Sequence, residues 1–414
     1  MASETEVDTN GADGGLAIRV VSGIGGFARD EWEALSGASR GISETPYNPF
    51  ISFDFLQILE ESGCAVRDTG WQGHHLRLEK ADGGLLGAVP CYVKSHSQGE
   101  YVFDHGWADA FERAGGNYYP KLQAAVPFTP ATGPRLLVSH GQDPATIRSG
   151  LALGLRAVTE KLGVSSAHVT FAQENDMDAL EGAGFLRRTD QQFHFFNEGY
   201  SSYDDFLATL ASRKRKALKK ERREALSEGI SIEWLTGKDL TEAHWDAFYA
   251  FYMDTGDRKW GRPYLTRTFF SLIGERMPDD VLLVMAKRAG RYIAGAINFI
   301  GSDTLFGRNW GCIEDHRFLH FEVCYHQAID FAIANGLKVV EAGAQGEHKL
   351  ARGYRPVTTQ SAHFIAHAGL RNAVADYLER ERREVSRMGD YLDEHGPFRR
   401  GGPELSERSS SKTD

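Results

Sequence analysis

The sequence is poor in cysteine, with four among 414 residues. The four are far apart, and no two have the two-residue spacing of a zinc knuckle or a redox pair. This scarcity excludes a small disulfide-stabilised protein, and we expect reduced thiols in the core. The cysteines are Cys64, Cys91, Cys312 and Cys324.

Long apolar runs are also missing. No stretch reaches the roughly 18 uninterrupted apolar residues that a membrane span needs. The chain begins Met1-Ala2-Ser3-Glu4 and continues acidic and polar, without the basic flank and apolar run of a signal peptide. We therefore expect a soluble, cytoplasmic protein with no membrane span.

An excess of positive charge is absent as well. The chain has 47 Lys and Arg against 57 Asp and Glu, a net charge of −10. A protein that binds nucleic acid over its whole surface usually has the opposite sign, so any site for a polyanion must be a local basic patch. The 41% hydrophobic and 25% charged residues are typical of a globular protein, and the length predicts about two or three domains.

What the sequence does contain is an internal repeat. Residues 76–93 have the pattern of two strands joined by a glycine turn, and residues 281–300 repeat it. In both halves an aromatic strand with a tryptophan, then a helix and a further strand, are expected to follow. The matching order favours two similarly folded halves over one large sheet. The later elements are expected at 101–107, 147–162 and 166–171 in the first half, and at 304–310, 320–335 and 338–342 in the second.

Alternating strand and helix patterns predict a mixed α/β (α+β) class. Both ends of the chain lack apolar periodicity, so they are expected to be disordered. The predicted organisation is a disordered segment at 1–14, a first domain at 15–195, a second domain carrying the main site at 196–385, and a mostly disordered tail at 386–414.

Three stretches carry a family resemblance. The first runs from Phe206 to Ile230 and includes 213–223, which has eight cations and one anion. The second pairs Phe248-Tyr249-Ala250-Phe251-Tyr252 with Lys259-Trp260-Gly261-Arg262-Pro263-Tyr264-Leu265. The third runs from Gly336 to Pro356 through Glu341-Ala342-Gly343-Ala344-Gln345-Gly346-Glu347-His348-Lys349. Over about residues 15–385 the chain resembles the FemAB-like branch of the GNAT acyltransferases, which is similar to non-ribosomal peptidyl transferases and was long known only as a domain of unknown function.

The resemblance implies two tandem GNAT-like domains, each a mixed, mostly antiparallel sheet flanked by helices. It implies an N-acyltransferase whose donor is aminoacyl-tRNA and whose acceptor is an amine, as on a cell-wall precursor. The donor would be a cosubstrate, with no cofactor bound tightly. Related enzymes take acyl-CoA, but this chain lacks the Arg/Gln-x-x-Gly-x-Gly/Ala loop that grips pyrophosphate. The alternatives are an acyl-CoA-dependent N-acetyltransferase and a non-catalytic module that binds a phosphorylated ligand.

Acyl transfer to an amine needs a neutral nucleophile, a carbonyl held nearby and stabilisation of the oxyanion. Lys349 follows a glycine-rich turn, so we expect it at the oxyanion or at a donor phosphate; the alternative is that it caps the loop. Replacing it with Met is expected to abolish turnover with little loss of stability. Glu341, Glu347 and His348 are candidates for a general base or for orienting Lys349.

Cations cover nearly every face of a helix over 213–223, so pairing with carboxylates does not account for them. They predict a phosphate-contacting edge, for tRNA or a nucleotide sugar; the alternative is a solvated helix. Aromatic and cationic residues after Phe248 are expected to wall the acceptor cleft. The candidate substrate-binding residues are Arg213, Arg215, Lys216, Tyr252, Lys259, Trp260, Trp310, Arg352 and Tyr354. His316 and His320 lie four apart but lack the Glu of a metalloprotease helix, so no metal is predicted.

Overall fold

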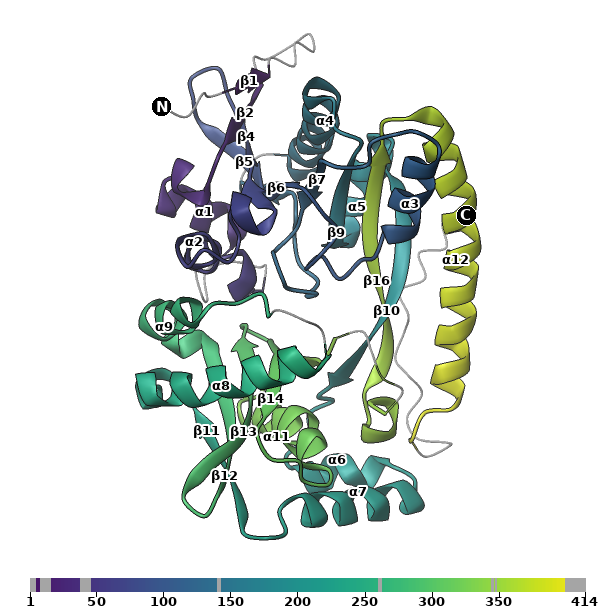
Figure 1. Cartoon of the computed structure of the whole chain (residues 1–414). Helices are drawn as coiled ribbons and strands as arrows, with labels where there is room; N and C mark the ends of the chain where they lie inside the picture. Colours follow the sequence, from purple (N-terminus) through teal and green to yellow (C-terminus); the bar gives the residue numbers. More distant parts are fainter. Residues whose placement is uncertain are drawn as a thin grey trace.

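The computed structural model describes residues 5–7, 16–37, 46–139, 143–259, 263–343, 346 and 348–398. Two lobes lie one above the other, and two long strands with a long helix run from one lobe to the other (Figure 1). Within the described ranges, every helix is either too short or too polar to cross a membrane. Trp260 and Glu347, two of the predicted site residues, lie outside the described residues.

Sixteen strands form two sheets in the described residues. The strands are β1 (Thr5–Val7), β2 (Ala17–Val21), β3 (Trp71–Gly73), β4 (His75–Glu79), β5 (Leu85–Val89), β6 (Cys91–Lys94), β7 (Lys121–Ala124), β8 (Leu137–Val138), β9 (Ser166–Ala172), β10 (Leu186–Phe196), β11 (Ile230–Leu235), β12 (Val281–Arg288), β13 (Arg291–Ile300), β14 (Thr304–Cys312), β15 (Val339–Glu341) and β16 (Arg355–Ile365).

Helices cover both lobes. They are α1 (Arg29–Ser36), α2 (Phe53–Glu61), α3 (His105–Arg113), α4 (Pro144–Leu162), α5 (Glu174–Gly182), α6 (Tyr203–Thr209), α7 (Ser212–Ala225), α8 (Glu242–Lys259), α9 (Arg267–Arg276), α10 (Leu319–Phe321), α11 (Gln327–Ala334) and α12 (Ala368–Glu394). A π-helical turn, Glu322–His326, joins α10 to α11 within the predicted helix over 320–335. Such turns are rare and are frequent at functional sites.

The mixed α/β class is confirmed, but the two halves share one sheet. Its eleven strands have the order β11-β12-β13-β14-β15-β10-β16-β9-β7-β6-β3. β10 closes the first predicted domain, yet it pairs with β15 and β16 of the second, and β16 pairs with β9 of the first. The two halves form two lobes, as the sequence indicates, and their strands join in one sheet. The reason is length, because 11-residue strands extend about 36 Å and reach across both lobes.

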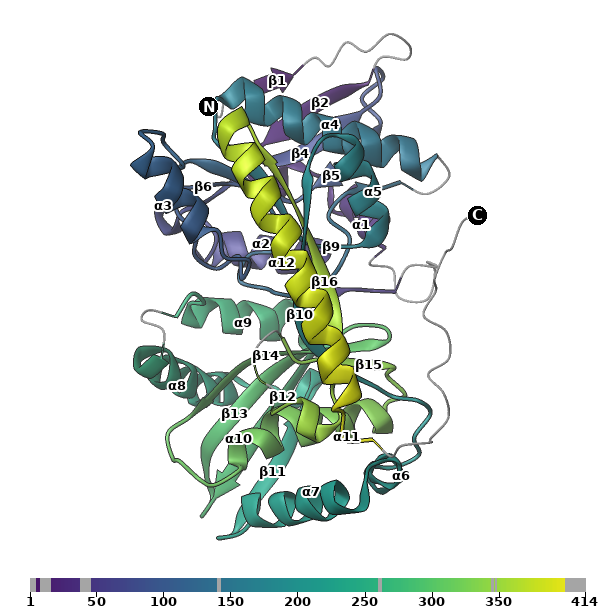
Figure 2. The ribbon, with the colours of Figure 1, turned by 90° about the vertical axis from the view of Figure 1, so that its right-hand side faces the viewer.

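Two predictions need correction. The stretch 101–107 is no strand, because α3 begins at His105. The predicted tail at 386–414 begins inside α12, which continues to Glu394. One side of this helix packs Leu370 and Val374 against Trp107 of the first lobe, while Leu392 joins the core of the second. Packing on both lobes accounts for the length of α12, and Figure 2 shows it crossing them.

The second lobe has a helix layer on each face of its sheet. Residues alternate along β14, so Phe306 packs with the core that includes α8 and α9, while Leu305 packs with α6, α7 and α11. The first of these cores is shared with the first lobe. The Phe50 ring lies 5.0 Å from Phe299 and 5.1 Å from Phe306, between ring centroids. The lobes are thus joined by packing as well as by the sheet.

Candidate functional site

The candidate site lies where two parallel strands of the second lobe separate. β14 and β15 pair over only three positions, from Thr304 with Val339 to Phe306 with Glu341. β15 ends there, whereas β14 continues to Cys312. In α/β sheets, ligands bind beyond the carboxyl ends of parallel strands, where neighbouring strands diverge. The last residue of β15, Glu341, occupies such a point.

Side-chain alternation places Glu341 on the face toward the first lobe. Val340 packs in the core with α11, so its neighbour Glu341 faces the other way. In β14 the register shifts between Gly307 and Trp310, a bulge that puts one extra residue in the strand. Arg308 therefore lies against Phe50 of the first lobe, while Trp310 packs on the His320 ring at 5.2 Å.

Glu341 is half-buried, and one oxygen of its carboxyl is held out of water. Burial raises its pKa to about 8, although the Thr132 backbone amide and the positive charges of Arg135 and Arg308 oppose the rise. Among the described residues its Oε2 has no hydrogen-bond partner, and it has no contact with solvent. A carboxyl with a pKa near the working pH suits proton transfer, which is the role that the sequence suggested for Glu341.

Lys349 is buried, with 3% of its surface exposed. Its Nζ donates to the carbonyl oxygens of Ala342 and Gly343, at 2.5 and 2.9 Å. Burial lowers its pKa to about 8. The ammonium thus caps the carbonyls that follow β15, the alternative left open by the sequence. A catalytic role for Lys349 stays a prediction.

Residues on both sides of Lys349 face the helix side of the sheet. His348 Nε2 lies 3.0 Å from the Tyr325 hydroxyl of the π-helical turn. Arg352 donates to both carboxylate oxygens of Glu221 in α7, at 2.8 and 2.7 Å, and to the His348 carbonyl at 2.6 Å. Tyr354 is fully buried, and its hydroxyl donates to the Tyr325 carbonyl. Arg352 and Tyr354 therefore hold the lobe together, and the core position of the Tyr354 ring contradicts its predicted contact with substrate.

The predicted basic helix is α7, and its charges divide between two faces. Glu221 and Arg222 point inward, and Arg222 pairs with the buried Glu322 at 2.8 Å. Arg213 and Lys216 are exposed and Arg215 is half-buried. α7 lies at the end of the second lobe that is remote from the first lobe (Figure 1).

The predicted acceptor wall is only partly described. Tyr252 is buried in the core beside Phe270, and its hydroxyl accepts from the Leu265 amide at 3.1 Å. This buried position contradicts the prediction that Tyr252 contacts the acceptor. Lys259 is the last residue of α8, and its side chain lies outside the described residues, as do Trp260 and Glu347.

Sequence reasoning missed Arg308 and the loops that face it. Tyr101 and Phe128 have left-handed backbones, with φ of 59° and 57°. Such strain costs about 1–3 kcal/mol per residue and clusters at binding and catalytic sites. The Phe128 carbonyl accepts from Arg308 Nη2, and the Tyr101 ring lies 5.9 Å from the guanidinium. The one indication of Arg308 in the sequence is that a cation lies within the aromatic strand predicted at 304–310.

The first lobe also has a point where two parallel strands stop pairing, but there a side chain already fills the space. β7 and β9 also run parallel over three positions. Beyond them lies the buried Arg135, which donates to the carbonyls of Thr170, Ala131 and Pro134 at 2.9, 2.7 and 3.2 Å. The backbone thus occupies this guanidinium, whereas in the second lobe one oxygen of Glu341 has no partner in the part of the chain that the structure describes.

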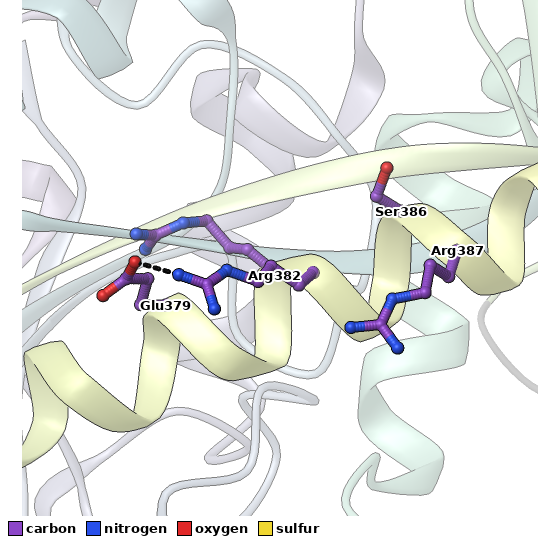
Figure 3. Close-up of a pocket in the computed structure, with 5 residues that line it drawn as sticks. Glu379, Arg382, Ser386 and Arg387 are labelled. Atoms are coloured by element: carbon purple, nitrogen blue, oxygen red, sulfur yellow. Dashed lines mark hydrogen bonds and ion pairs between the residues drawn. The ribbon is translucent and has the colours of Figure 1, made fainter.

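A groove of about 450 Å³ lies on the outer face of α12. Figure 3 shows its side chains, among which an ion pair joins Arg383 to Glu379. Arg382 donates to the Arg187 carbonyl of β10 at 2.5 Å. The charged residues at 379–384 thus attach α12 to the sheet. For this reason we do not place the functional site in this groove. The groove is lined by Glu379, Arg382, Arg383, Ser386 and Arg387.

Among the described residues, no group of three or more His, Cys, Asp and Glu is arranged to hold a metal ion. No curated protein sequence matches the chain. Three solved structures resemble it across most of its length: FemX (11% identity, 84% of this chain and 98% of that one, TM-score 0.52), L-PGS from Bacillus licheniformis (9%, 83% and 96%, 0.45) and a tandem GNAT protein from the clavulanic acid biosynthesis pathway (11%, 85% and 99%, 0.44). Of these, FemX alone has a TM-score above 0.5, and at 11% identity the likeness is one of fold.

The sequence itself matches a family profile over residues 23–400, nearly the whole chain. The profile describes peptidoglycan biosynthesis or recognition. The match, the FemX-like fold and the strand divergence in the second lobe agree with the resemblance seen in the sequence. The chain belongs to the FemAB-like family.

Proposed function

We propose that this protein transfers an aminoacyl group from aminoacyl-tRNA to an amine, on an acceptor of the cell-wall-precursor type. The observation that carries the proposal is the Glu341 carboxyl where β14 and β15 separate, with a pKa of about 8 and an Oε2 that has no hydrogen-bond partner among the described residues. An ammonium group cannot attack a carbonyl until it loses a proton, and a carboxylate of this pKa is matched to accept one.

The proposed step balances within this site. Glu341 takes a proton from the acceptor ammonium, and the freed amine forms a C–N bond with the acyl carbonyl. The ester C–O bond then breaks, Glu341 passes this proton to the leaving oxygen of the donor, and the second excess proton of the attacking nitrogen is released to solvent, so that the amide keeps one hydrogen. Lys349 supports this step by positioning, because it fixes the two carbonyls that follow Glu341.

The choice of donor rests on α7 and on a missing motif. Arg213 and Lys216 lie on an exposed face with no ion pair recorded among the described residues, as a polyanion site requires. The chain also lacks the pyrophosphate-gripping loop of acyl-CoA enzymes. The family description supports a peptidoglycan precursor as acceptor. A charged tRNA as donor would place the reaction in the cytoplasm.

The test is incubation of the protein with a pool of charged tRNAs and acyl-CoAs, with and without candidate amines. Mass spectrometry identifies the donor that is deacylated and the product that forms. Amine-dependent deacylation of tRNA is the expected result. Consumption of acyl-CoA alone would establish the N-acetyltransferase alternative. Absence of product with every donor would favour the binding module.

The α7 cations predict a steep salt dependence of donor binding. For the double variant Arg213→Gln and Lys216→Gln, the log–log slope of affinity against salt is expected to become shallower by about one to two units. A matched control is Lys238→Gln with Arg291→Gln, two exposed cations outside α7. A wild-type slope near zero would contradict the phosphate-binding role of α7.

A further inference from the structure

We propose that Arg308 binds a carboxylate of the acceptor, so the acceptor is an amine with a carboxylate near it, as in an amino acid. The inference rests on the proposed function in calling this ligand the acceptor. It assigns a substrate class that neither the family match nor the fold specifies.

Arg308 forms no ion pair with any of the described residues. It is half-buried, and Glu341 acts on it only as a neighbouring charge. Its recorded hydrogen bonds go to the Phe128 carbonyl and to the Tyr101 side chain. A guanidinium has five N–H donors, so these two bonds leave most of its donors without a partner among the described residues. Arg135, by contrast, is bound by three carbonyls.

The surroundings of Arg308 hold their shape without a ligand. Buried ion pairs fix the loop that carries Tyr101, because Lys121 Nζ lies 2.6 Å from Asp104 and 3.4 Å from Glu100. On the other side, the exposed Tyr264 ring stacks on Phe128 at 4.9 Å. Groups fixed in advance lose little entropy when a ligand binds. Aromatic rings therefore flank a guanidinium that is already in position.

The neighbouring charges favour a carboxylate over a phosphate. The Arg fork makes two parallel hydrogen bonds to a carboxylate. Glu341 interacts electrostatically with Arg308, and burial, together with the charge of Glu100, raises the pKa of Tyr264. Lys121 is already paired with Asp104 and Glu100, so Arg308 offers one positive charge, which matches the single charge of a carboxylate better than the double charge of a phosphate. A zwitterion suits the same charges, since its carboxylate meets Arg308 and its amine meets Glu341, the proposed base.

The test compares pairs of amines that differ by one carboxylate. Calorimetry measures binding of lysine against cadaverine and of alanine against ethylamine. The wild type is expected to bind the carboxylate-bearing member of at least one pair about 10- to 100-fold more tightly. Arg308→Gln is expected to lose this preference, and Arg308→Lys, which keeps the charge but not the fork, to retain part of it. The exposed Arg291→Gln is the control and should bind as the wild type does.

Thermal unfolding shows that each variant is folded before its binding is compared. Equal binding within both pairs, no binding of either carboxylate, or an intact preference in folded Arg308→Gln would each overturn the proposal. Acyl transfer to amines without a carboxylate preference would leave the proposed function standing and remove this inference. Carboxylate binding without transfer to any amine would support the carboxylate site and contradict the proposed function.

Discussion

Glu341→Gln is expected to lower the rate of acyl transfer about 10²- to 10⁴-fold, the usual contribution of a general base. Glutamine has the same shape but cannot accept the proton of the acceptor ammonium. The fold should tolerate the change, because burial already favours the neutral carboxyl at pH 7 and raises its pKa to about 8. The measurement is kcat/KM with the donor identified by mass spectrometry. The exposed Glu112→Gln makes the same chemical change elsewhere and should act as the wild type.

The same carboxyl predicts a pH dependence. The base must be ionised, so the wild-type rate should rise with pH and level off above about 8, and the glutamine variant should lack this inflection. Stability should change in the opposite direction. A carboxyl whose folded pKa is raised contributes stability below its unfolded pKa of about 4.5, and loses it as pH rises through about 8. The variant should therefore gain stability relative to wild type between pH 5 and 9. A wild-type rate or an unchanged inflection in the variant would contradict the assignment.

Lys349→Met is expected to lower the free energy of unfolding by about 3 kcal/mol, since hydrogen bonds to charged groups contribute about 1.5–3 kcal/mol each. The variant leaves the Ala342 carbonyl without its recorded donor and removes one of the donors to Gly343. The end of β15 would then lose its position, and transfer would fall with stability. This expectation differs from the one drawn from sequence, which was little loss of stability.

Denaturant unfolding measures this effect, with the exposed Lys338→Met as control. Lys349→Arg should recover part of the stability, because a guanidinium also donates to carbonyls. If Lys349→Met unfolds like wild type and is inactive, the capping role is refuted and the direct catalytic role predicted from sequence is supported.

Local patterns predicted the elements whose stability is local. The helix at 147–162 forms as α4, the strand at 166–171 as β9, and the hairpin at 281–300 as β12 and β13. The strand predicted at 101–107 failed because aromatic residues suit a strand and a buried helix face alike, and Trp107 packs under α12. Partners far apart in the sequence, such as β16 and β9, leave no local signal.

The candidate site likewise has features that the sequence predicts and features that only the tertiary structure shows. Glu341 and Lys349 were identified from the sequence, because a strand that ends in a glycine-rich turn has a recognisable pattern. Their chemistry was decided by tertiary structure: a half-buried carboxyl for one, a capping ammonium for the other. Arg308 became evident only when loops from the first lobe were seen to meet β14. Periodicity and composition act between near neighbours in the chain and so can be read from it. Desolvation and charge pairing depend on which distant strands come together, and only the folded chain determines that.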